Sequence, residues 1–543
     1  MRGLMMDFQL TLPATVLRRC EELHGPKEVV TRLPDKSLHR YTYAEMIDRA
    51  KRMAVALGKL GLQRGDRVAT LCWNHYRHLE AYTAVPASGC VLHTLNLRLH
   101  HDDLAYIASH AGDKVLIVDL SLYELWEKFR ERTSIEHVIV VCEQGETAPE
   151  GTIEYEDWLA DADPSRYSMP DLDENEAAAM CYTSGTTGKP KGVLYSHRAI
   201  TLHTLGTMTI DGLGICEKDI CLPVVPMFHA NAWGFPYSAT YCGAKQVFPG
   251  PHLDPPSLLE LLASEKVTLT AGVPTIWLGM LQILDENPDK YDLSAIRAMV
   301  VGGSAAPRSM IEGFQKRHGL SIVHAWGMTE MTPMGTNSQL PSCLLEAPEE
   351  EQFAFRSKQG RPVPLVEVRG RNEDGIVPWD GQTMGELEVR GPWIASTYYE
   401  SPDGAKSFTD DGWFRTGDIV CIGQDGCVQL QDRAKDVIKS GGEWISSVAL
   451  ENAIMGHPDV AEAAVIPCEH PKWAERPLAL VVLKPGRNAT PEQLREFLEP
   501  QFAKWWLPDA FAMIDAIPKT SAGKFLKTAL RERFGDYYTG GAH

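Results

Sequence analysis

The stretch from Tyr182 to His197, YTSGTTGKPKGVLYSH, carries the residue types that bind phosphate groups. Between Thr183 and Gly192 it holds three glycines, four hydroxyl side chains and two lysines. Backbone N–H groups beside glycine and short hydroxyls can converge on phosphate oxygens, while lysine supplies positive charge. The same composition is also typical of a flexible linker, so the stretch alone favours neither interpretation.

The loop does not match the common nucleotide-binding pattern G-x-x-x-x-G-K-[ST]. Pro190 follows Lys189 where a magnesium-binding hydroxyl is required, and Thr183 stands at the position five before Gly188. Because proline fixes φ and removes a donor, a phosphate-binding helix cannot run straight on from Lys189. The chain also lacks G-x-G-x-x-G and the serine-hydrolase pattern G-x-S-x-G, which excludes these classes.

Five further motifs follow the loop along the chain. They are GGSAAP (Gly302–Pro307), AWGMTE (Ala325–Glu330), RTGD (Arg415–Asp418), DRAKDVIKSGGEWIS (Asp432–Ser446) and PKTSAGK (Pro518–Lys524). In this order they resemble the signature motifs of the adenylate-forming superfamily, which includes acyl-CoA synthetases, peptide-synthetase adenylation domains and beetle luciferases. The resemblance spans nearly the whole chain and implies ATP, Mg²⁺ and coenzyme A as cosubstrates and cofactors.

Adenylation of a carboxylate crowds negative charge, because a carboxylate oxygen attacks the α-phosphate while pyrophosphate leaves. The resemblance implies a catalytic role for Thr183 and Glu330 as the magnesium site; read alone, Glu330 is a surface acid. It also implies a set of residues that hold the β- and γ-phosphates: Thr183, Ser184, Gly185, Thr186, Thr187 and Lys191.

The resemblance places the rest of the nucleotide in two further motifs. The adenine and acyl-phosphate region is implied to be lined by Gly303, Ser304, Ala305, His324, Ala325, Trp326, Gly327, Met328 and Thr329. The family usually has tyrosine where this chain has Trp326, so stacking on adenine is kept but a hydrogen bond from a tyrosine hydroxyl is lost. Asp418 matches the ribose ligand, since a carboxylate accepts hydrogen bonds from both ribose hydroxyls.

Asp432 matches the family's hinge residue, about which a small domain rotates between the two half-reactions. Lys524 matches the catalytic lysine that bridges the carboxylate and the α-phosphate. After the hinge, the resemblance implies contacts with the nucleotide or the pantetheine passage from Arg433, Lys435, Lys439 and Trp444. The implied domains are residues 1–431, a hinge at 432–437 and a lid at 438–543.

The segment VVPMFHANAWGFPYSA, Val224–Ala239, is expected to shape the acyl site. His229 matches a family position beside the reacting carboxylate, with a catalytic and substrate-binding role, and Ala230 and Trp233 are expected to touch the acyl group. The segment resembles the medium- and long-chain fatty acyl-CoA synthetase branch, in which this tryptophan gates an apolar tunnel. Methylmercaptopropionate ligases share much of the pattern, and the tail length stays open between the two.

The elements that must position these residues are predicted strands and helices that alternate along the chain, as in an α/β fold. Tyr43–Leu62 has helical spacing, and buried strands such as Val115–Asp119 and His137–Cys142 alternate with helical segments. We expect a large N-terminal domain of parallel-rich sheets with crossover helices. After Val366 the shorter β runs with a GQDG turn predict a β-barrel-like unit, and a small α+β domain, mobile by resemblance, follows Arg433.

Composition sets the outer limits. The 543 residues exceed the roughly 250–300 at which one core stops growing, so at least two domains are expected. A net charge of −19 argues against nucleic acid as the main partner. Twelve cysteines without a C-x-x-C pair, a poor signal peptide and no apolar run long enough to span a bilayer predict a cytoplasmic protein with at most peripheral membrane contact.

Three hypotheses remain for function. The first is a two-step fatty acyl-CoA synthetase, which related enzymes suggest is a homodimer. The second is an adenylating enzyme whose acceptor is not free coenzyme A, and the third is a non-catalytic nucleotide sensor. The intact Thr183, Glu330, Asp418 and Lys524 argue against the third.

Overall fold

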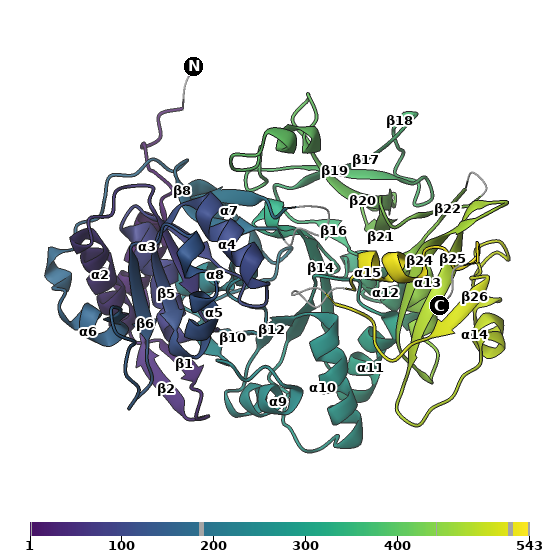
Figure 1. Ribbon diagram of the computed structural model, residues 1–543, viewed down its shortest axis with the longest axis horizontal. Coiled ribbons are helices and arrows are strands. Elements are labelled where there is room, and N and C mark those ends of the chain that lie inside the picture. The colour runs from purple at the N-terminus through teal and green to yellow at the C-terminus, as the bar shows by residue number, and fades with distance from the viewer. Residues whose placement is uncertain (2, 184–188, 441–442, 520–524, 541–543) are drawn as a thin grey trace.

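A computed structural model describes all residues except 2, 184–188, 441–442, 520–524 and 541–543. Four β-sheets form its framework, and helices cover and separate them (Figure 1). The first helices are α1 (Arg18–Leu23), α2 (Tyr43–Lys59), α3 (Tyr76–Ala87), α4 (His101–Ala111), α5 (Tyr123–Glu127), α6 (Tyr155–Ala160), α7 (His197–Met208) and α8 (Phe235–Cys242). The others are α9 (Pro255–Ser264), α10 (Pro274–Glu286), α11 (Arg308–His318), α12 (Glu349–Arg356), α13 (Ser447–Met455), α14 (Pro491–Leu498) and α15 (Lys527–Phe534).

The first sheet has the strand order β7-β6-β5-β3-β4-β8-β9 in the described part of the chain. Its strands are β3 (Arg67–Leu71), β4 (Val91–Thr94), β5 (Asp113–Asp119), β6 (His137–Val141), β7 (Ile153–Glu154), β8 (Ala177–Tyr182) and β9 (Gly192–Ser196). Neighbours are parallel except for the β8–β9 pair, which is antiparallel and encloses the glycine-rich loop. The predicted parallel sheet with crossover helices is confirmed.

The second sheet has the order β16-β15-β14-β13-β12-β10-β11-β1-β2. Its strands are β1 (Glu28–Arg32), β2 (Leu38–Thr42), β10 (Ile220–Pro223), β11 (Lys245–Phe248), β12 (Leu269–Gly272), β13 (Ala298–Val301), β14 (Ile322–Gly327), β15 (Met334–Asn337) and β16 (Arg361–Pro362). A short hairpin from the N-terminus, β1 and β2, thus completes a sheet built mainly from residues 220–362, because β1 pairs with β11 in parallel.

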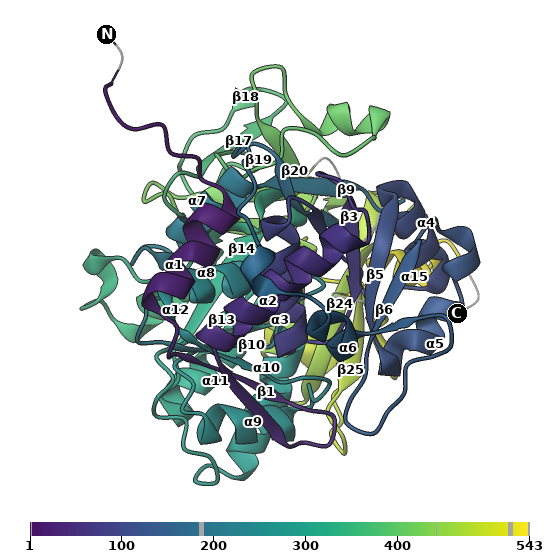
Figure 2. The same cartoon turned by 90° about the vertical axis from the view of Figure 1, so that its left-hand side faces the viewer.

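A shared helical layer joins these two sheets. One buried cluster includes Val68 and Ile117 of the first sheet, Val29 and Ala271 of the second, and residues of α2, α3 and α8 such as Leu57. Figure 2 shows α1, α2 and α3 from the side, with the N-terminal segment projecting away from the body. α2 begins at a capping box of Thr42 and Glu45 and ends at Lys59, where the glycine-bearing turn at the end of the predicted Tyr43–Leu62 pattern follows.

The third and fourth sheets belong to the C-terminal part of the chain. The antiparallel order β18-β17-β19-β20-β21 contains β17 (Glu367–Asn372), β18 (Gly375–Ile376), β19 (Gly385–Arg390), β20 (Phe414–Ile422) and β21 (Val428–Arg433), with the predicted turn at Gly423–Gly426. The last sheet contains β22 (Ile438–Ser440), β23 (Glu443–Ile445), β24 (Val460–His470), β25 (Ala474–Leu483) and β26 (Ala510–Met513). With α13, α14 and α15 it forms the predicted small α+β unit.

Candidate active site

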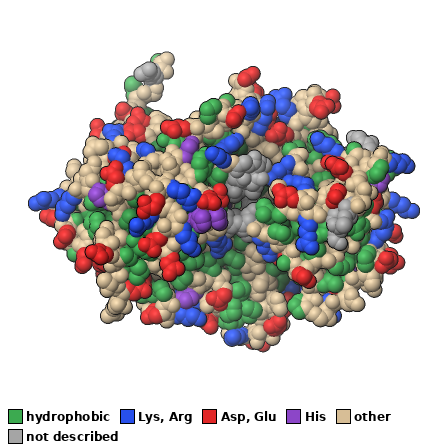
Figure 3. Space-filling model, in the orientation of Figure 1, with side chains coloured by type: hydrophobic (Ala, Val, Ile, Leu, Met, Phe, Trp, Pro, Cys, Tyr) green, Lys and Arg blue, Asp and Glu red, His purple; other side chains and the backbone are tan. Residues whose placement is uncertain are grey.

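One cleft of about 850 Å³ collects residues from the second and third sheets and from the C-terminal unit. Its volume lies in the range typical of ligand sites, about 300–1,000 Å³. The surface in the view of Figure 3 mixes acidic and basic side chains, without one broad field of a single sign. The electrostatics of the site therefore depend on individual residues that line the cleft.

The glycine-rich loop is closed at its base by two hydrogen bonds. The Thr183 backbone N–H donates to the Lys191 carbonyl (3.0 Å), and the Lys191 N–H donates to Oγ1 of Thr183 (3.1 Å). Thr183, Lys189 and Lys191 line the cleft. The other predicted phosphate-binding residues, Ser184, Gly185, Thr186 and Thr187, lie outside the described residues.

Glu330 lies beside this loop base and is buried, with 6% of its surface exposed. The hydroxyl of Tyr398 donates a 2.5 Å hydrogen bond to its Oε1, and the Lys191 ammonium lies 4.6 Å from the centre of the Tyr398 ring. Burial and the Glu330 carboxylate raise the pKa of Tyr398, so this hydroxyl stays protonated and remains a donor. A carboxylate and a threonine hydroxyl on one cleft wall are hard oxygen ligands, which suit Mg²⁺.

The predicted adenine and acyl-phosphate residues all line the same cleft. They are Gly303, Ser304, Ala305, His324, Ala325, Trp326, Gly327, Met328 and Thr329. Burial lowers the pKa of His324 to about 4, so its ring is neutral at physiological pH. A Cβ atom at Gly302 would lie 3.0 Å from the Ala325 carbonyl oxygen, which explains why small residues follow β13.

Asp418 is held from two sides at the point where β20 pairs with β21. The Trp326 indole Nε1–H donates to Asp418 Oδ2 (2.9 Å), and Nε of Arg433 lies 2.8 Å from Oδ1. Asp418 and Arg433 are register partners across the two strands. All three residues line the cleft, as the motifs predicted.

His229, Ala230 and Trp233 also line the cleft. Ala230 to Trp233 have φ between 42° and 56°, so this short turn is left-handed although none of its four residues is glycine. Each such residue costs roughly 1–2 kcal/mol, which the surrounding packing must offset.

A second, smaller pocket of about 30 Å³ is also lined by Trp233. His229, Trp233 and Gly303 line both this pocket and the large cleft, and Arg98, Val225 and Phe228 line the small one. Trp233 is therefore part of the wall of both spaces.

Asp432, the predicted hinge residue, is buried, and its carboxylate accepts hydrogen bonds from the backbone N–H groups of Ser447 (2.7 Å) and Arg433 (2.8 Å). Nζ of Lys527 lies 2.6 Å from Oε1 of Glu451 and donates to Oγ of Ser447 (2.6 Å). Burial raises the pKa of Glu451 to about 7, although the Lys527 ammonium opposes this rise. A buried charge network thus lies next to Asp432.

The structure brings only some of the predicted post-hinge residues to the cleft. Arg433 and Lys435 line it, and burial lowers the pKa of Lys435. Lys439 and Trp444 face each other across β22 and β23 and are not among the lining residues. Lys524 lies outside the described residues, while Phe525 and Lys527 next to it line the cleft.

Two residues at the site were missed by the motif analysis. Tyr398 lies in the STYYE segment, which carries no recognisable spacing, and only its contact with Glu330 reveals it. Lys527 follows the PKTSAGK motif by three residues, and its place at the start of a C-terminal helix was the available signal.

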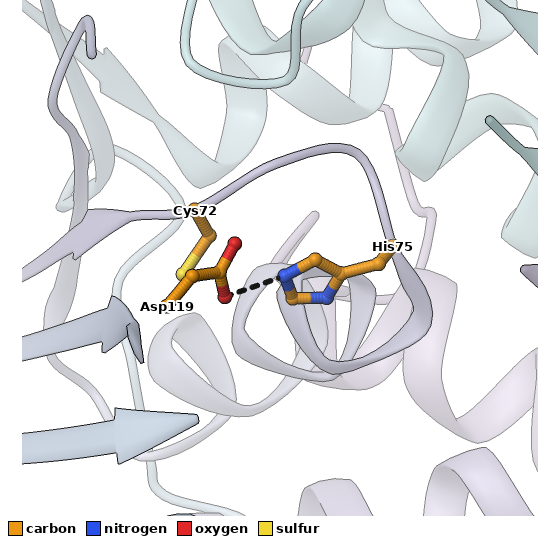
Figure 4. Close-up of side chains that lie close together, drawn as sticks. All are labelled: Cys72, His75 and Asp119. Carbon is orange, nitrogen blue, oxygen red and sulfur yellow. Dashed lines mark hydrogen bonds and ion pairs between the residues drawn. The ribbon is translucent and has the colours of Figure 1, made fainter. Parts of the chain in front are cut away.

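Cys72, His75 and Asp119 form a separate buried group whose potential ligand atoms lie within 4.8 Å of one another (Figure 4). His75 Nδ1 accepts from the His78 backbone N–H, so Nε2 carries the proton and donates to Asp119 (2.8 Å). Asp119 also accepts from the Trp73 N–H, and Cys72 donates to the Ile117 carbonyl. Burial raises the pKa of the Cys72 thiol, which disfavours a thiolate ligand. These hydrogen bonds satisfy the three groups and anchor the start of α3 against β5.

The family of the protein follows from comparison with known sequences. The model of the AMP-binding enzyme family matches residues 18–399, and that of the AMP-binding enzyme C-terminal domain matches residues 449–524. The chain belongs to the AMP-binding enzyme family. The adenylate-forming resemblance inferred from the motifs is confirmed.

Relatives of this AMP-binding enzyme match it from end to end. A long-chain-fatty-acid–CoA ligase of Thermus thermophilus is 52% identical over 541 residues, covering 99% of this chain and 98% of the relative. A 3-methylmercaptopropionyl-CoA ligase of Ruegeria lacuscaerulensis is 43% identical over 544 residues, covering 99% and 100%. The relatives therefore include both kinds of ligase that the acyl-site segment resembles, the fatty-acid and the methylmercaptopropionate ligases.

Solved structures agree with the fold of this AMP-binding enzyme. ATP-bound MatB from Rhodopseudomonas palustris superimposes with a TM-score of 0.82 at 26% identity, covering 97% of this chain and 99% of that one. The anthranilate CoA ligase AuaEII, in complex with anthranoyl-AMP, gives a TM-score of 0.86 at 23% identity, covering 98% and 99%, and supports the fold alone. Among the described residues, none of the helices has the length and apolar character needed to cross a membrane.

Proposed function

We propose that this AMP-binding enzyme is an ATP-dependent ligase that joins a fatty acid to coenzyme A through an acyl-adenylate. The observation that carries the proposal is a single cleft that collects the loop base at Thr183 and Lys191, the buried Glu330, the braced Asp418 and the apolar end at Trp233. The end-to-end similarity to fatty-acid–CoA ligases supports the same activity.

In the first half-reaction a carboxylate oxygen of the acid attacks the α-phosphorus of ATP, and the bond to pyrophosphate breaks. Lys191 and the loop that it closes hold the leaving phosphates, and Asp418 accepts the ribose hydroxyls. His229 and Ala230 orient the acid in the cleft. Thr183 and Glu330 would hold Mg²⁺, and a cation bound there would neutralise part of the phosphate charge. Lys524 remains the proposed bridge between the carboxylate and the α-phosphate.

In the second half-reaction the coenzyme A thiolate sulfur attacks the acyl carbonyl carbon, and AMP leaves with the bonding electrons. We propose that residues 438–543 rotate about the hinge 432–437 relative to residues 1–431 between the two steps. Separate buried clusters built wholly from residues beyond 437, such as the one around Ile438, Val465 and Phe511, support this division. Lys439 and Trp444, which do not line the present cleft, are then available for the pantetheine passage after rotation.

A second candidate is a ligase for short thioether acids of the methylmercaptopropionate type. The pocket beside Trp233 measures about 30 Å³, against about 850 Å³ for the large cleft. A long tail can enter it only if the Trp233 indole moves, whereas a short acid needs no such movement. Burial of each additional methylene favours binding by about 0.8 kcal/mol once the tunnel is open.

An assay with ATP, Mg²⁺ and coenzyme A across saturated acids of increasing length and methylmercaptopropionate tests both candidates. We expect AMP and thioester release, with kcat/KM rising with chain length for the fatty-acid ligase and peaking at the short acids for the alternative. Pyrophosphate release without thioester would instead indicate an acceptor other than coenzyme A. No AMP with any acid would overturn the proposal.

We also propose a homodimer in a reducing, cytoplasmic location. All twelve cysteines are free and ten are buried, which suits a reducing compartment. Leu4, Met5, Met6 and Phe8 are exposed on the projecting N-terminal segment, and such apolar side chains gain by packing against a second copy. Light scattering should give twice the 60.2 kDa chain mass, and a variant with these four residues changed to serine should shift toward monomer. A monomeric mass for the unmodified protein would contradict this proposal.

A further inference from the structure

Trp326 occupies the family's usual tyrosine position, and its indole does more than face the nucleotide region. Its Nε1–H donates to Oδ2 of Asp418 over 2.9 Å. We propose that Trp326 is a positioning residue that orients the Asp418 carboxylate for the ribose hydroxyls of ATP. This inference rests on the proposed function, in which Asp418 accepts those hydroxyls.

The Asp418 carboxylate is held by two neighbours but still has lone-pair sites that accept no hydrogen bond. Each oxygen of a carboxylate has about two lone-pair sites. The Trp326 indole donates to one lone-pair site on Oδ2. Nε of Arg433 lies 2.8 Å from Oδ1 and forms an ion pair with it, but this contact does not have the geometry of a hydrogen bond. Asp418 is only 1% exposed, yet among the described residues its Oδ1 accepts no hydrogen bond. A buried acceptor left open beside a ligand cleft fits a ribose hydroxyl as its missing donor.

The indole is itself held in the orientation that this hydrogen bond requires. Trp326 lies near the end of β14, with a register shift between Trp326 and Gly327 opposite β15. A Cβ atom at Gly335 would lie 2.7 Å from Cζ3 of Trp326 and 2.6 Å from Cε of Met331. The indole therefore packs directly on the backbone of β15, where only glycine leaves enough room.

A phenylalanine at this position would keep an aromatic face but lose the N–H donor. The Asp418 carboxylate would then be free to rotate toward Arg433, and its open lone pairs would no longer point at both ribose hydroxyls. The loss of a hydrogen bond to a charged group corresponds to a roughly 10- to 100-fold change in an equilibrium or rate constant.

The test compares the wild-type protein with Trp326→Phe, using ATP, 2′-deoxy-ATP and 3′-deoxy-ATP in pyrophosphate release by the adenylation half-reaction. In the wild type we expect each missing hydroxyl to lower kcat/KM. In Trp326→Phe we expect kcat/KM for ATP to fall about tenfold. We also expect the hydroxyl penalty, which is the ratio of kcat/KM for ATP to kcat/KM for a deoxy analogue, to fall toward one. A penalty equal to that of the wild type would overturn the inference, even if the variant were slower overall.

Trp73→Phe is the matched control, because the Trp73 indole donates to Ser121 and does not line the cleft. It should leave the hydroxyl penalties unchanged, while Asp418→Asn should abolish them. Calorimetric titration with AMP and 2′-deoxy-AMP gives the same comparison without turnover. A wild type that binds AMP but activates no acid would contradict the proposed function alone, and the AMP titrations would still decide the role of Trp326.

Discussion

The Tyr398 hydroxyl and the Glu330 carboxylate form the shortest described contact beside the phosphate-loop base, at 2.5 Å. Glu330 is buried, so its carboxylate oxygens have little contact with water and are stabilised by hydrogen-bond donors such as the Tyr398 hydroxyl. Lys191 lies against the same tyrosine ring, which links the loop base to the proposed metal ligand. Tyr398 therefore sets where the Glu330 oxygens point.

We predict that Tyr398→Phe lowers the rate of adenylation and raises the Mg²⁺ concentration needed for half-maximal activity. Loss of a hydrogen bond to a buried charged group costs about 1.5–3 kcal/mol, or roughly 10- to 100-fold. The measurement is pyrophosphate release as a function of Mg²⁺ at saturating ATP.

Tyr399→Phe is the neighbouring control, because Tyr399 is not among the residues that line the cleft and its backbone N–H pairs with Gly192. It should keep the wild-type Mg²⁺ dependence. If Tyr398→Phe shows an unchanged Mg²⁺ requirement, Tyr398 does not orient Glu330.

Helix α15 follows the segment that contains Lys524, and its side chains contact the predicted hinge, residues 432–437, and the residues packed against it. Its first residue, Lys527, contacts Glu451 and Ser447 of α13, and the Ser447 N–H in turn donates to Asp432. One turn further on, Arg531 pairs with Asp436. The helix therefore presents two cations, four residues apart, to the carboxylates behind the hinge.

We predict that Lys527→Met destabilises the protein by about 3–5 kcal/mol near neutral pH, because it leaves buried carboxylates without their counter-charge. The pKa of Glu451 is already raised from 4.5 to about 7 in the folded protein. The folded state thus holds this proton more tightly than the unfolded state, and the stability contribution falls as pH rises from 4.5 to 7. In the variant this fall should extend to higher pH.

Chemical denaturation of both proteins between pH 5 and pH 8 measures this effect, and the difference in unfolding free energy should be smaller at pH 5. Arg533→Met, an exposed change on the same helix, should leave the pH dependence unaltered. If Lys527→Met lowers the unfolding free energy by the same amount at every pH, Lys527 stabilises the protein through packing and not through its charge.

At the scale of the whole molecule, many helices, strands and motifs were predictable because each depends on a short stretch of sequence. Apolar runs located strands such as β5 and β6 of the first sheet, and six ordered motifs named residues as distant as Thr183, Glu330 and Asp418, which all line the cleft. The pattern from Tyr43 to Leu62 corresponds to α2 and the glycine-bearing turn after it, in which Gly61 has a φ of 81°.

Other features could not be predicted, because strand partners and side-chain contacts depend on packing between distant segments. β1 was not predicted, because its sequence EVVTR has only two apolar residues, and nothing local indicates that β11 pairs with it. The same limit applies to Trp326, for which the sequence predicted the loss of a tyrosine hydroxyl. The structure adds that an indole N–H reaches Asp418 instead.

The pairing of β1 with β11 also has a consequence for how the chain is made. The hairpin of β1 and β2 leaves the ribosome early, but Val29 cannot meet Gln246 until the chain has been synthesised past β11. At about 5–20 residues per second, the free edge of β1 waits roughly 10–40 s for its partner. During synthesis this short apolar edge is open to pairing with other nascent chains, so the protein should depend on chaperones most before residue 248 emerges.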